Sequence, residues 1–250
     1  MMLNQAAMSE VSNPCRVACV TGGAKRIGRA LVLALHQANY NIIIHYHTSE
    51  SEAIELVDYC NAIRPQSAKS VQGDLENFET LPQLTWRIIN SFGRLDCLVH
   101  NASRFYPTPF GQISQQDWQN LFLTNAQTPL FISQYLYPYL KKSQGCIISI
   151  LDIHANGKPF GGYTVYNMAK AAHQMMVQSL AIELAPDIRV NGIAPGINIL
   201  PMEGTEQALT AETIEKICHA VPLKRIGTPQ DIAQVAVFLA AAPYITGQII

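Results

Sequence analysis

The chain has 250 residues, which is long enough for one large α/β domain or two small ones with a sizeable core. Hydrophobic residues make up 48% of it and charged residues only 14%, against a usual ~25%, so the composition excludes a disordered chain. The formal net charge of −1 gives no reason to expect a nucleic acid or an anionic membrane surface as a partner.

The sequence also argues against a membrane span and a secretory signal. The longest apolar run, around 232–245, is interrupted by Gln234 and Pro243 and falls short of the ~20 residues that a span needs. Residues 1–13 lack a basic region and an apolar core, and we expect them to form a flexible tail. The cysteines are scattered without metal-ligand spacing, which favours reduced thiols in a cytoplasmic protein and no metal site; they are residues 15, 19, 60, 97, 146 and 218.

Short β-branched runs alternate with longer helical patterns along the chain. The expected strands are 16–20, 41–46, 68–72, 94–100, 145–150 and 188–193. The expected helices are 26–38, 50–63, 77–91, 114–141 and 163–184. Continuously apolar strands suit a parallel sheet covered on both faces, and repeated right-handed crossovers give a doubly wound sheet. Without a linker-like stretch or a repeat, residues 14–250 are expected to form a single-domain, Rossmann-type α/β fold.

Ligands of such sheets bind at the carboxyl ends of the strands, near the point where the strand order reverses. Candidate functional residues follow five of the expected strands, at 21–28, Asp74, 100–106, 149–152 and 194–198. We therefore expect one cleft built from several strand ends.

The first expected strand runs directly into "TGGAKRIG" (21–28), which resembles a phosphate-binding loop. Its glycines would let the backbone approach a pyrophosphate at the start of the next helix. The end of the second strand, "HYHTS" (45–49), has no carboxylate for a ribose 2′-hydroxyl, whereas Lys25 and Arg26 suit the 2′-phosphate of NADP. The alternative interpretation is that Lys25 and Arg26 are solvated charges at the start of a helix and bind no phosphate. NADPH is the expected cofactor.

His45 and His47 occupy alternate positions of one strand and point the same way, as two metal ligands would. No third ligand stands nearby in the sequence. We expect hydrogen-bonded histidines at a strand end instead of a metal site.

Tyr166 and Lys170 lie four residues apart and so share one face of the expected helix 163–184. A nearby ammonium stabilises a phenolate, so the pair is a candidate proton donor for a substrate that accepts hydride. Tyr137 and Lys141 have the same spacing, but they end a helix away from the phosphate loop. We expect that second pair to be structural.

Over essentially its whole length, the chain resembles the short-chain dehydrogenase/reductase family. The resemblance is carried by "TGGAKRIG" (21–28), Asp74-Leu75, "HNAS" (100–103), Asn125, "YNMAK" (166–170), "RVNGIAPG" (189–196) and "RIGTPQDIA" (225–233). It implies that Tyr166 donates a proton, that Lys170 binds the nicotinamide ribose and lowers the pKa of the tyrosine, and that Asn125 holds a water in the proton relay.

The resemblance also implies how the cofactor is bound. Asp74 would meet the adenine, Asn101 would flank the cofactor, and the loop at Pro195 and Gly196 would cover the nicotinamide. The expected cofactor-binding residues are Gly22, Lys25, Arg26, Ile27, His45, Tyr46, His47, Thr48, Ser49, Asp74, Leu75, Asn101, Ala102, Ser103, Tyr166, Lys170, Pro195 and Gly196.

Within the family, the departures from the common pattern resemble the pteridine reductases. Asp152 stands where a typical member has serine. Similar stretches are "AKRIGRAL" (24–31), with arginine for the loop's middle glycine, "HYH" (45–47), "NASRFYPTPF" (101–110) and "GGYTVYNMAK" (161–170). Thr48 stands where that subgroup often has arginine, and Asp152 lies fourteen residues before Tyr166, one more than expected. The chain ends before the Asp-Gly-Gly stretch that such proteins usually carry.

A carboxyl group at position 152 suits the reduction of a C=N bond in a pterin. Such a reduction needs a proton on nitrogen, and a carboxylic acid can supply it while also accepting hydrogen bonds from the ring. By resemblance, Asp152 and Tyr166 share the proton-donor work, and the substrate-binding residues are Ser103, Phe105, Asp152, Tyr163 and Tyr166. Phe105 would stack on a pterin or folate substrate against the nicotinamide.

Other interpretations remain open. Asp152 can serve as a cap in a turn, and Phe105 with Tyr106 can anchor a loop on the core. A reductase for a 3-oxoacyl thioester or small ketone would prefer serine to Asp152 and would not need Phe105. A non-catalytic NADP-binding sensor would be expected to lack Tyr166 or Lys170, and the chain has both.

Residues at about 200–222 are expected to form a mobile lid that selects the side chain of the pterin. Dihydrobiopterin, dihydromonapterin and dihydrofolate all stay open as substrates. The family usually forms tetramers through long helices such as 114–141 and 163–184, so a homotetramer is expected.

Overall fold

The structure is a computed structural model, and it describes residues 15–198 and 210–250. Its centre is a parallel sheet of six strands in the order β3-β2-β1-β4-β5-β6, which confirms the predicted doubly wound α/β fold. The strands are β1 (Val17–Val20), β2 (Asn41–Tyr46), β3 (Ala68–Gln72), β4 (Cys97–His100), β5 (Cys146–Ile150) and β6 (Arg189–Ile193). The order reverses between β1 and β4, so a ligand cleft is expected beyond the carboxyl ends of these two strands.

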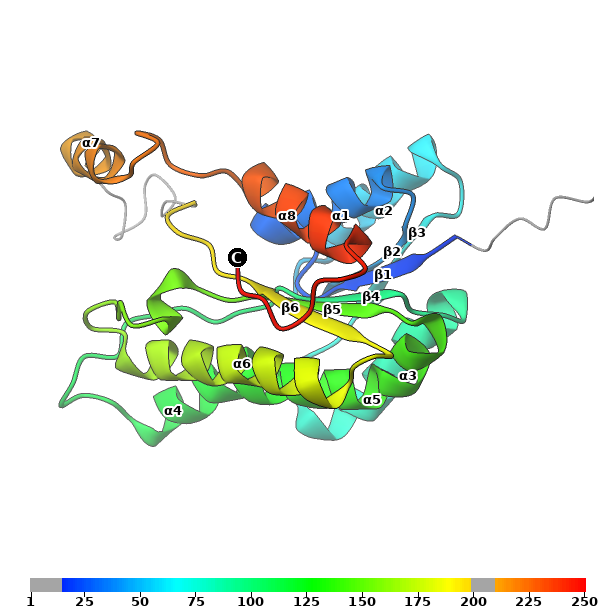
Figure 1. Cartoon of the computed structure of the whole chain (residues 1–250), viewed down its shortest axis with the longest axis horizontal. Helices are drawn as coiled ribbons and strands as arrows, with labels where there is room; N and C mark the ends of the chain where they lie inside the picture. Colours follow the sequence, from blue (N-terminus) through cyan, green and yellow to red (C-terminus); the bar gives the residue numbers. More distant parts are fainter. Residues whose placement is uncertain (1–14, 199–209) are drawn as a thin grey trace, which may run out of the picture.

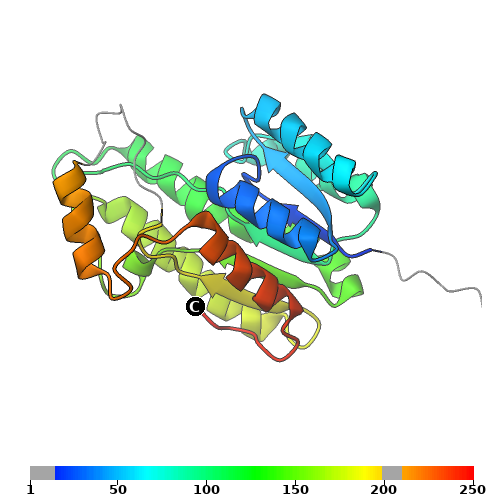
Figure 2. The same cartoon turned by 90° about the horizontal axis from the view of Figure 1, so that it is seen from above.

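Helices cover both faces of the sheet, as Figure 1 shows. One face carries α1 (Arg26–Gln37), α2 (Glu50–Ile63) and α8 (Pro229–Ala241). The other carries α3 (Leu81–Phe92), α4 (Gln115–Phe122), α5 (Thr128–Ser143) and α6 (Thr164–Glu183). The helix α7 (Ala211–Ala220) stands apart from the others at one end of the molecule (Figures 1 and 2). Among the described residues, no helix is both long and apolar enough to cross a membrane.

Each strand contributes side chains to two hydrophobic layers. In β2, Ile42 and Ile44 pack into the layer beneath α1 and α8, while Ile43 packs into the layer beneath α3, α5 and α6. All three side chains are fully buried. Full burial of such a side chain contributes roughly 1.5–3 kcal/mol, so strands that are apolar on both faces favour this three-layer arrangement.

The predicted helix 114–141 is wrong as a single α-helix. A π-helical turn, Leu123–Gln127, separates α4 from α5. Pro129 has no N–H to donate to the carbonyl of Asn125 four residues earlier, so one bond of the α-helical ladder is missing next to this turn. The turn places Asn125 in the interior, where it is 1% exposed.

Candidate active site

A cavity of about 930 Å³ opens at the carboxyl ends of the strands. Residues after β1, β2, β4, β5 and β6 line it, as expected for a cleft built from strand ends. It brings together the predicted residues Gly22, Lys25, Arg26, Ile27, Tyr46, His47, Thr48, Ser49, Asn101, Ala102, Ser103, Phe105, Asp152, Tyr163, Tyr166, Lys170, Pro195 and Gly196. The predicted residues His45, Asp74, Leu75 and Asn125 do not line the cavity.

The loop after β1 is shaped to admit a ligand against its backbone. Gly22 has a φ of +60°, and a Cβ at Gly28 would lie 2.1 Å from the carbonyl oxygen of Gly22. The side-chain amide of Asn101 donates to the carbonyls of Thr21 at 2.9 Å and Gly22 at 3.0 Å, which ties the loop to the end of β4. A glycine cradle at the start of α1 fits the pyrophosphate of a dinucleotide.

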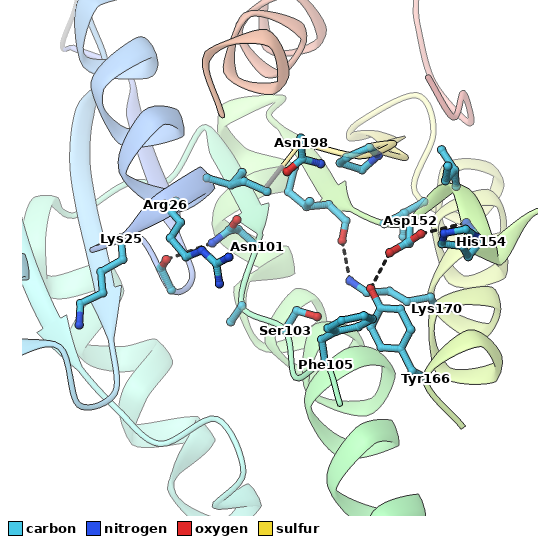
Figure 3. A pocket seen from close by; sticks show the side chains of 18 of the residues that line it. Lys25, Arg26, Asn101, Ser103, Phe105, Asp152, His154, Tyr166, Lys170 and Asn198 are labelled. Atoms are coloured by element: carbon cyan, nitrogen blue, oxygen red, sulfur yellow. Dashed lines mark hydrogen bonds between the residues drawn. The ribbon is translucent and has the colours of Figure 1, made fainter. Parts of the chain in front are cut away.

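Lys25 and Arg26 lie at the end of the cavity remote from Tyr166 (Figure 3). Arg26 has a φ of +52°, in the left-handed region that favours glycine, so the chain accepts backbone strain to keep a guanidinium there. The Lys25 ammonium lies 2.6 Å from a carboxylate oxygen of Glu52 on α2. Lys25, Arg26 and residues 46–49 all line the cavity, and none of residues 46–49 is a carboxylate.

His45 supports the phosphate loop from behind. The N–H of Gly22 donates to Nδ1 of His45 at 3.2 Å, so the ring carries its hydrogen on Nε2, which faces the carbonyl of Gly73 at 3.1 Å. Burial lowers the pKa of His45 to about 4, against the opposing effect of the Gly73 carbonyl, and the ring is neutral. His47 lies 3.9 Å from a carboxylate oxygen of Asp74. Within the described part of the chain, no group of side chains is arranged to hold a metal.

The opposite end of the cavity joins Asp152 to Tyr166. The phenol of Tyr166 donates to Oδ2 of Asp152 at 2.7 Å, and Oδ1 of Asp152 accepts from the backbone N–H of His154 at 2.9 Å (Figure 3). Asp152 thus caps a short 3₁₀ turn, Ile153–Ala155, and also holds the tyrosine. Burial raises the pKa of Tyr166, and the Asp152 carboxylate raises it further. The phenol therefore keeps its proton in this structure, and a lowering of its pKa by Lys170 stays a prediction.

Lys170 is 3% exposed and lies one helical turn beyond Tyr166 on α6. Its ammonium donates to the carbonyl of Ile150 at 2.9 Å. Burial lowers the pKa of Lys170 to about 8, and the nearby Asp152 opposes this shift. The group is therefore charged at neutral pH but gives up a proton more readily than an exposed lysine.

Asn125 uses its side chain to hold the loop that follows β4. Its amide hydrogens go to the carbonyls of Arg104 at 2.9 Å and Leu121 at 3.0 Å, and its amide oxygen accepts from the Ser103 hydroxyl at 2.6 Å. The side chain of Asn125 is therefore fully used, so the backbone carbonyl of Asn125 is the group that could hold the expected relay water. Arg104 also forms an ion pair with Glu76.

Aromatic rings form the wall beside Tyr166. Phe105 stacks on Tyr163 with ring centres 4.5 Å apart at an angle of 11°, and its edge meets Tyr166 at 4.8 Å. Phe105 is 53% exposed and lines the cavity, so it does not anchor the loop on the core. Tyr106, by contrast, packs in a small cluster with Leu121 and Val165, as a loop anchor does.

A family model described as enoyl-(acyl carrier protein) reductase matches residues 22–250. The chain belongs to the short-chain dehydrogenase/reductase family. It is 35% identical over 272 residues to pteridine reductase 1 of Leishmania tarentolae, covering 92% of each chain. It is 31% identical over 238 residues to the 3-oxoacyl-[acyl-carrier-protein] reductase FabG of Staphylococcus epidermidis, covering 93% of this chain and 95% of the relative. It is also 32% identical over 243 residues to the uncharacterized oxidoreductase YmfI of Bacillus subtilis, covering 94% and 96%.

As a member of this family, the chain is an oxidoreductase that works with a nicotinamide cofactor. Some residues that line the cavity of this short-chain dehydrogenase/reductase were not predicted individually. Those within the predicted strand-end segments and the predicted lid are Ala24, Gly28, Ile150, Leu151, Ile197, Asn198 and Ile217. The sequence analysis missed Ile153, His154 and Phe160. The one signal for His154 and Phe160 was the extra residue between Asp152 and Tyr166, because a longer loop can fold back over the cavity.

The second Tyr-Lys pair of the chain lies away from this site, as predicted. Lys141 lies at the end of α5, where its ammonium pairs with Asp187 at 2.9 Å and sits 5.8 Å from the centre of the Tyr137 ring. Neither residue lines the cavity.

The expected lid, 200–222, is covered only in part. Residues 200–209 lie outside the described residues. The rest contains α7, whose Ile217 lines the cavity.

Proposed function

We propose that the chain reduces a dihydropterin to a tetrahydropterin with NADPH, dihydrofolate being a further substrate of the same chemistry. The observation that carries this proposal is the hydrogen bond of 2.7 Å between Tyr166 and Asp152 inside the cavity. It joins two groups that can hold a transferable proton at the place where a ketone reductase needs only an orienting hydroxyl.

The cofactor site would be formed by the glycine loop, Asn101 and Lys170. When bound, NADPH supplies the hydride that reduces the C=N carbon. Lys25 and Arg26 support NADPH over NADH, because a 2′-phosphate needs cations and the 46–49 wall offers no carboxylate to a free 2′-hydroxyl.

The proton step uses the chain's own residues. Tyr166 stays protonated because burial and Asp152 raise its pKa. Its hydrogen bond gives the proton a direct route onto Asp152, which can pass it to the ring nitrogen as the new C–H bond forms. The C=N bond becomes a C–N single bond, and Tyr166 is left as the phenolate. Lys170, charged below a pKa of about 8, stabilises that phenolate and supplies its next proton.

The aromatic wall supports a flat heteroaromatic substrate. Phe105 lines the cavity, and its ring is braced by stacking on Tyr163, which also lines the cavity, with the ring centres 4.5 Å apart. Such a braced ring favours stacking with another flat ring. The similarity to the Leishmania tarentolae pteridine reductase supports the same choice.

A reductase of a 3-oxoacyl thioester or small ketone is the second candidate. The similarity to FabG of Staphylococcus epidermidis and the description of the matching family model favour it. A sensor without catalysis is a remote alternative, because the chain has Tyr166, Lys170 and Asp152 and all three line one cavity.

The experiment is NADPH oxidation with dihydrobiopterin, dihydromonapterin, dihydrofolate and an acetoacetyl thioester, using the unaltered protein, Asp152→Asn and Asp152→Ser. Asparagine keeps the oxygen that accepts from the His154 N–H, turns an NH2 donor toward the Tyr166 hydroxyl and cannot carry the proton. We expect it to lower kcat for the pterin by about 10²-fold or more, with little change in NADPH affinity. A pterin rate unchanged in both variants would remove Asp152 from the reaction, and turnover of the thioester alone would establish the second candidate.

We further propose a homotetramer in the cytoplasm. Exposed apolar side chains on α5 and α6 support subunit contacts; they include Leu130, Met168, Met175 and Ile182. Four buried free cysteines support a reducing compartment. Light scattering after gel filtration tests the assembly, and a monomer at micromolar concentration would contradict it.

A further inference from the structure

The loop between Asp152 and Tyr163 brings a further aromatic ring to the cavity. Phe160 lines the cavity and is 43% exposed, and the proton step described above does not use it. The loop is one residue longer than the family resemblance predicts, so it has the length to fold back over the cavity. An aromatic ring that stays half-exposed in a cavity is available to pack against a ligand.

Phe160 belongs to the same aromatic wall as Phe105. Its ring centre lies 4.6 Å from that of Tyr163, and the Phe105 and Phe160 rings are 6.4 Å apart at an angle of 22°. Tyr163 stacks on Phe105 as well, so it supports both phenylalanine rings. Phe105 also meets the Tyr166 ring, whereas among the described residues no ring contact joins Phe160 to Tyr166. Phe160 therefore lies one ring farther from the proposed proton donor.

His154, two residues after Asp152, holds the other side of Phe160. The His154 ring stacks on Phe160 with the ring centres 5.1 Å apart at an angle of 25°. Its backbone N–H donates to the Asp152 carboxylate (Figure 3), and its Nδ1 donates to the carbonyl of Lys158 at 2.6 Å. The Phe160 ring is thus held between Tyr163 on one side and His154 on the other.

Asn167 on α6 fixes the backbone of Phe160. Its side-chain nitrogen donates to the Phe160 carbonyl at 2.9 Å, and its side-chain oxygen accepts from the Phe160 N–H at the longer distance of 3.4 Å. One asparagine amide therefore satisfies both backbone polar groups of the residue that carries the ring. Because Asn167 directly follows Tyr166, these bonds tie the Phe160 ring to the helix that carries the proposed proton donor.

The cavity lining near Phe160 is poor in charge. Among the described residues that line the cavity from the loops 153–162 and 195–198 and from α7, none is Lys, Arg, Asp or Glu. Ile153, Ile197 and Ile217 supply apolar surface there. A substituent that packs on this part of the wall therefore gains by burying carbon and not by pairing charge.

We propose that Phe160 is a specificity-determining residue that packs on the side chain of a substituted dihydropterin, and that Asn167 is the positioning residue that holds Phe160 there. The proposal rests on the proposed function. A pterin that stacks on Phe105 with its reacting nitrogen at Asp152 leaves its substituent to the next ring of the wall, which is Phe160. A pterin with an uncharged carbon side chain gains this contact, and a pterin without a side chain does not.

The first test compares dihydrobiopterin, which carries a dihydroxypropyl side chain, with the dihydropterin that has no side chain. The readout is the ratio of their kcat/KM values with NADPH. We expect Phe160→Ala to lower this ratio about tenfold, mainly through a higher KM for dihydrobiopterin, and Phe160→Tyr to retain it. Asn167→Ala should lower the ratio in the same direction. Phe160→Leu, which removes the flat ring, serves the same comparison if Phe160→Ala does not fold.

Two matched controls accompany these variants. Phe110 is 91% exposed and does not line the cavity, so Phe110→Ala removes an exposed phenylalanine from another loop. Asn156 is an exposed asparagine of the loop that carries Phe160, and it does not line the cavity. We expect Phe110→Ala and Asn156→Ala to leave the ratio nearly unchanged.

The second test needs no substrate. Hydrogen–deuterium exchange of the segment 153–163 should be faster in Asn167→Ala than in the unaltered protein, because the backbone of Phe160 loses its partner. Exchange should stay unchanged in Asn156→Ala. If Asn167→Ala does not fold, Asn167→Asp provides the same test, since it keeps the acceptor and loses the donor. Unchanged exchange in the folded Asn167 variant would refute the positioning role.

The outcomes separate this inference from the proposed function. Turnover of both pterins with an unaltered ratio in Phe160→Ala would overturn the inference and leave the proposed function standing. An equal loss of kcat/KM for both pterins would also overturn it, because Phe160 would then support the wall without selecting a side chain. Turnover of neither pterin, with reduction of the acetoacetyl thioester, would overturn the proposed function and this inference with it.

Discussion

Gly28→Ala tests whether the loop after β1 is a cradle that tolerates no side chain. A Cβ at this position would lie 2.1 Å from the carbonyl oxygen of Gly22 and 2.9 Å from both the Cα of Gly23 and the side-chain nitrogen of Asn101. Real Cβ contacts do not fall below 3.0 Å, so the Gly22 carbonyl would have to move by at least about 0.9 Å. The obstacle is backbone and not the end of a flexible side chain, so the loop itself must shift.

Overpacking of this kind costs about 1–3 kcal/mol, which for a domain of this size lowers Tm by roughly 2–12 °C. The same shift moves the Gly22 backbone away from the place where a pyrophosphate would lie, so NADPH affinity should fall at least about tenfold. Differential scanning calorimetry measures the first effect, and fluorescence titration with NADPH measures the second.

The matched control is Gly161→Ala, because a Cβ at Gly161 would meet nothing within 4 Å and its φ is not in the left-handed region. We expect Tm and NADPH affinity close to those of the unaltered protein there. A Gly28→Ala protein with normal NADPH affinity would refute the cradle, whatever its Tm.

Three further predictions follow from the charged residues. Glu52→Gln should free Lys25 from its partner at 2.6 Å and tighten NADPH binding a few-fold while NADH binding stays the same; equal tightening of both would exclude a 2′-phosphate contact. Burial holds the pKa of Lys170 at about 8 against 10.5 for an exposed lysine, so the unfolded chain binds more protons between these values. The unfolding free energy should therefore rise across that window, and urea titrations of Lys170→Met should lack the rise. Arg104→Ala removes the ion pair with Glu76 that anchors the loop carrying Phe105, so kcat/KM for the pterin should fall about tenfold with NADPH affinity retained.

Local signals predicted the elements that depend on local sequence. The predicted bounds of β2, β3 and α2 coincide with the observed ones, because β-branched runs and helical periodicity change within a residue or two there. The predicted strand 94–100 begins instead at Cys97. Its first residues bend because the Asp96 carboxylate accepts from the Val17 N–H at 2.8 Å and pairs with Arg94, a contact across 79 positions of sequence that no local pattern contains. The π turn was not predicted for another reason. Pro129 lacks an N–H beside it, but Pro138 also lacks one and lies inside α5, so a proline alone does not indicate such a turn.

For the candidate site, too, the sequence predicted some features and not others. The motifs placed Tyr166, Lys170 and Asp152 in one cavity, because strand ends meet at one edge of a parallel sheet. They did not show that Asp152 would accept from Tyr166, since that depends on how the loop 153–162 folds between them. Nor did they show that His45 and Asn125 would support the site from behind. The identity of a residue does not by itself show whether its side chain holds a loop or faces a ligand.

The most direct test of the central claim is the ratio of kcat/KM values of the unaltered protein, with NADPH, for dihydrobiopterin and for an acetoacetyl thioester. The Tyr166–Asp152 pair and the braced Phe105 ring predict that the pterin is favoured by at least about tenfold. Efficient reduction of the thioester with no reaction of the pterin would contradict the account and leave Asp152 as the cap of a turn in a ketone reductase.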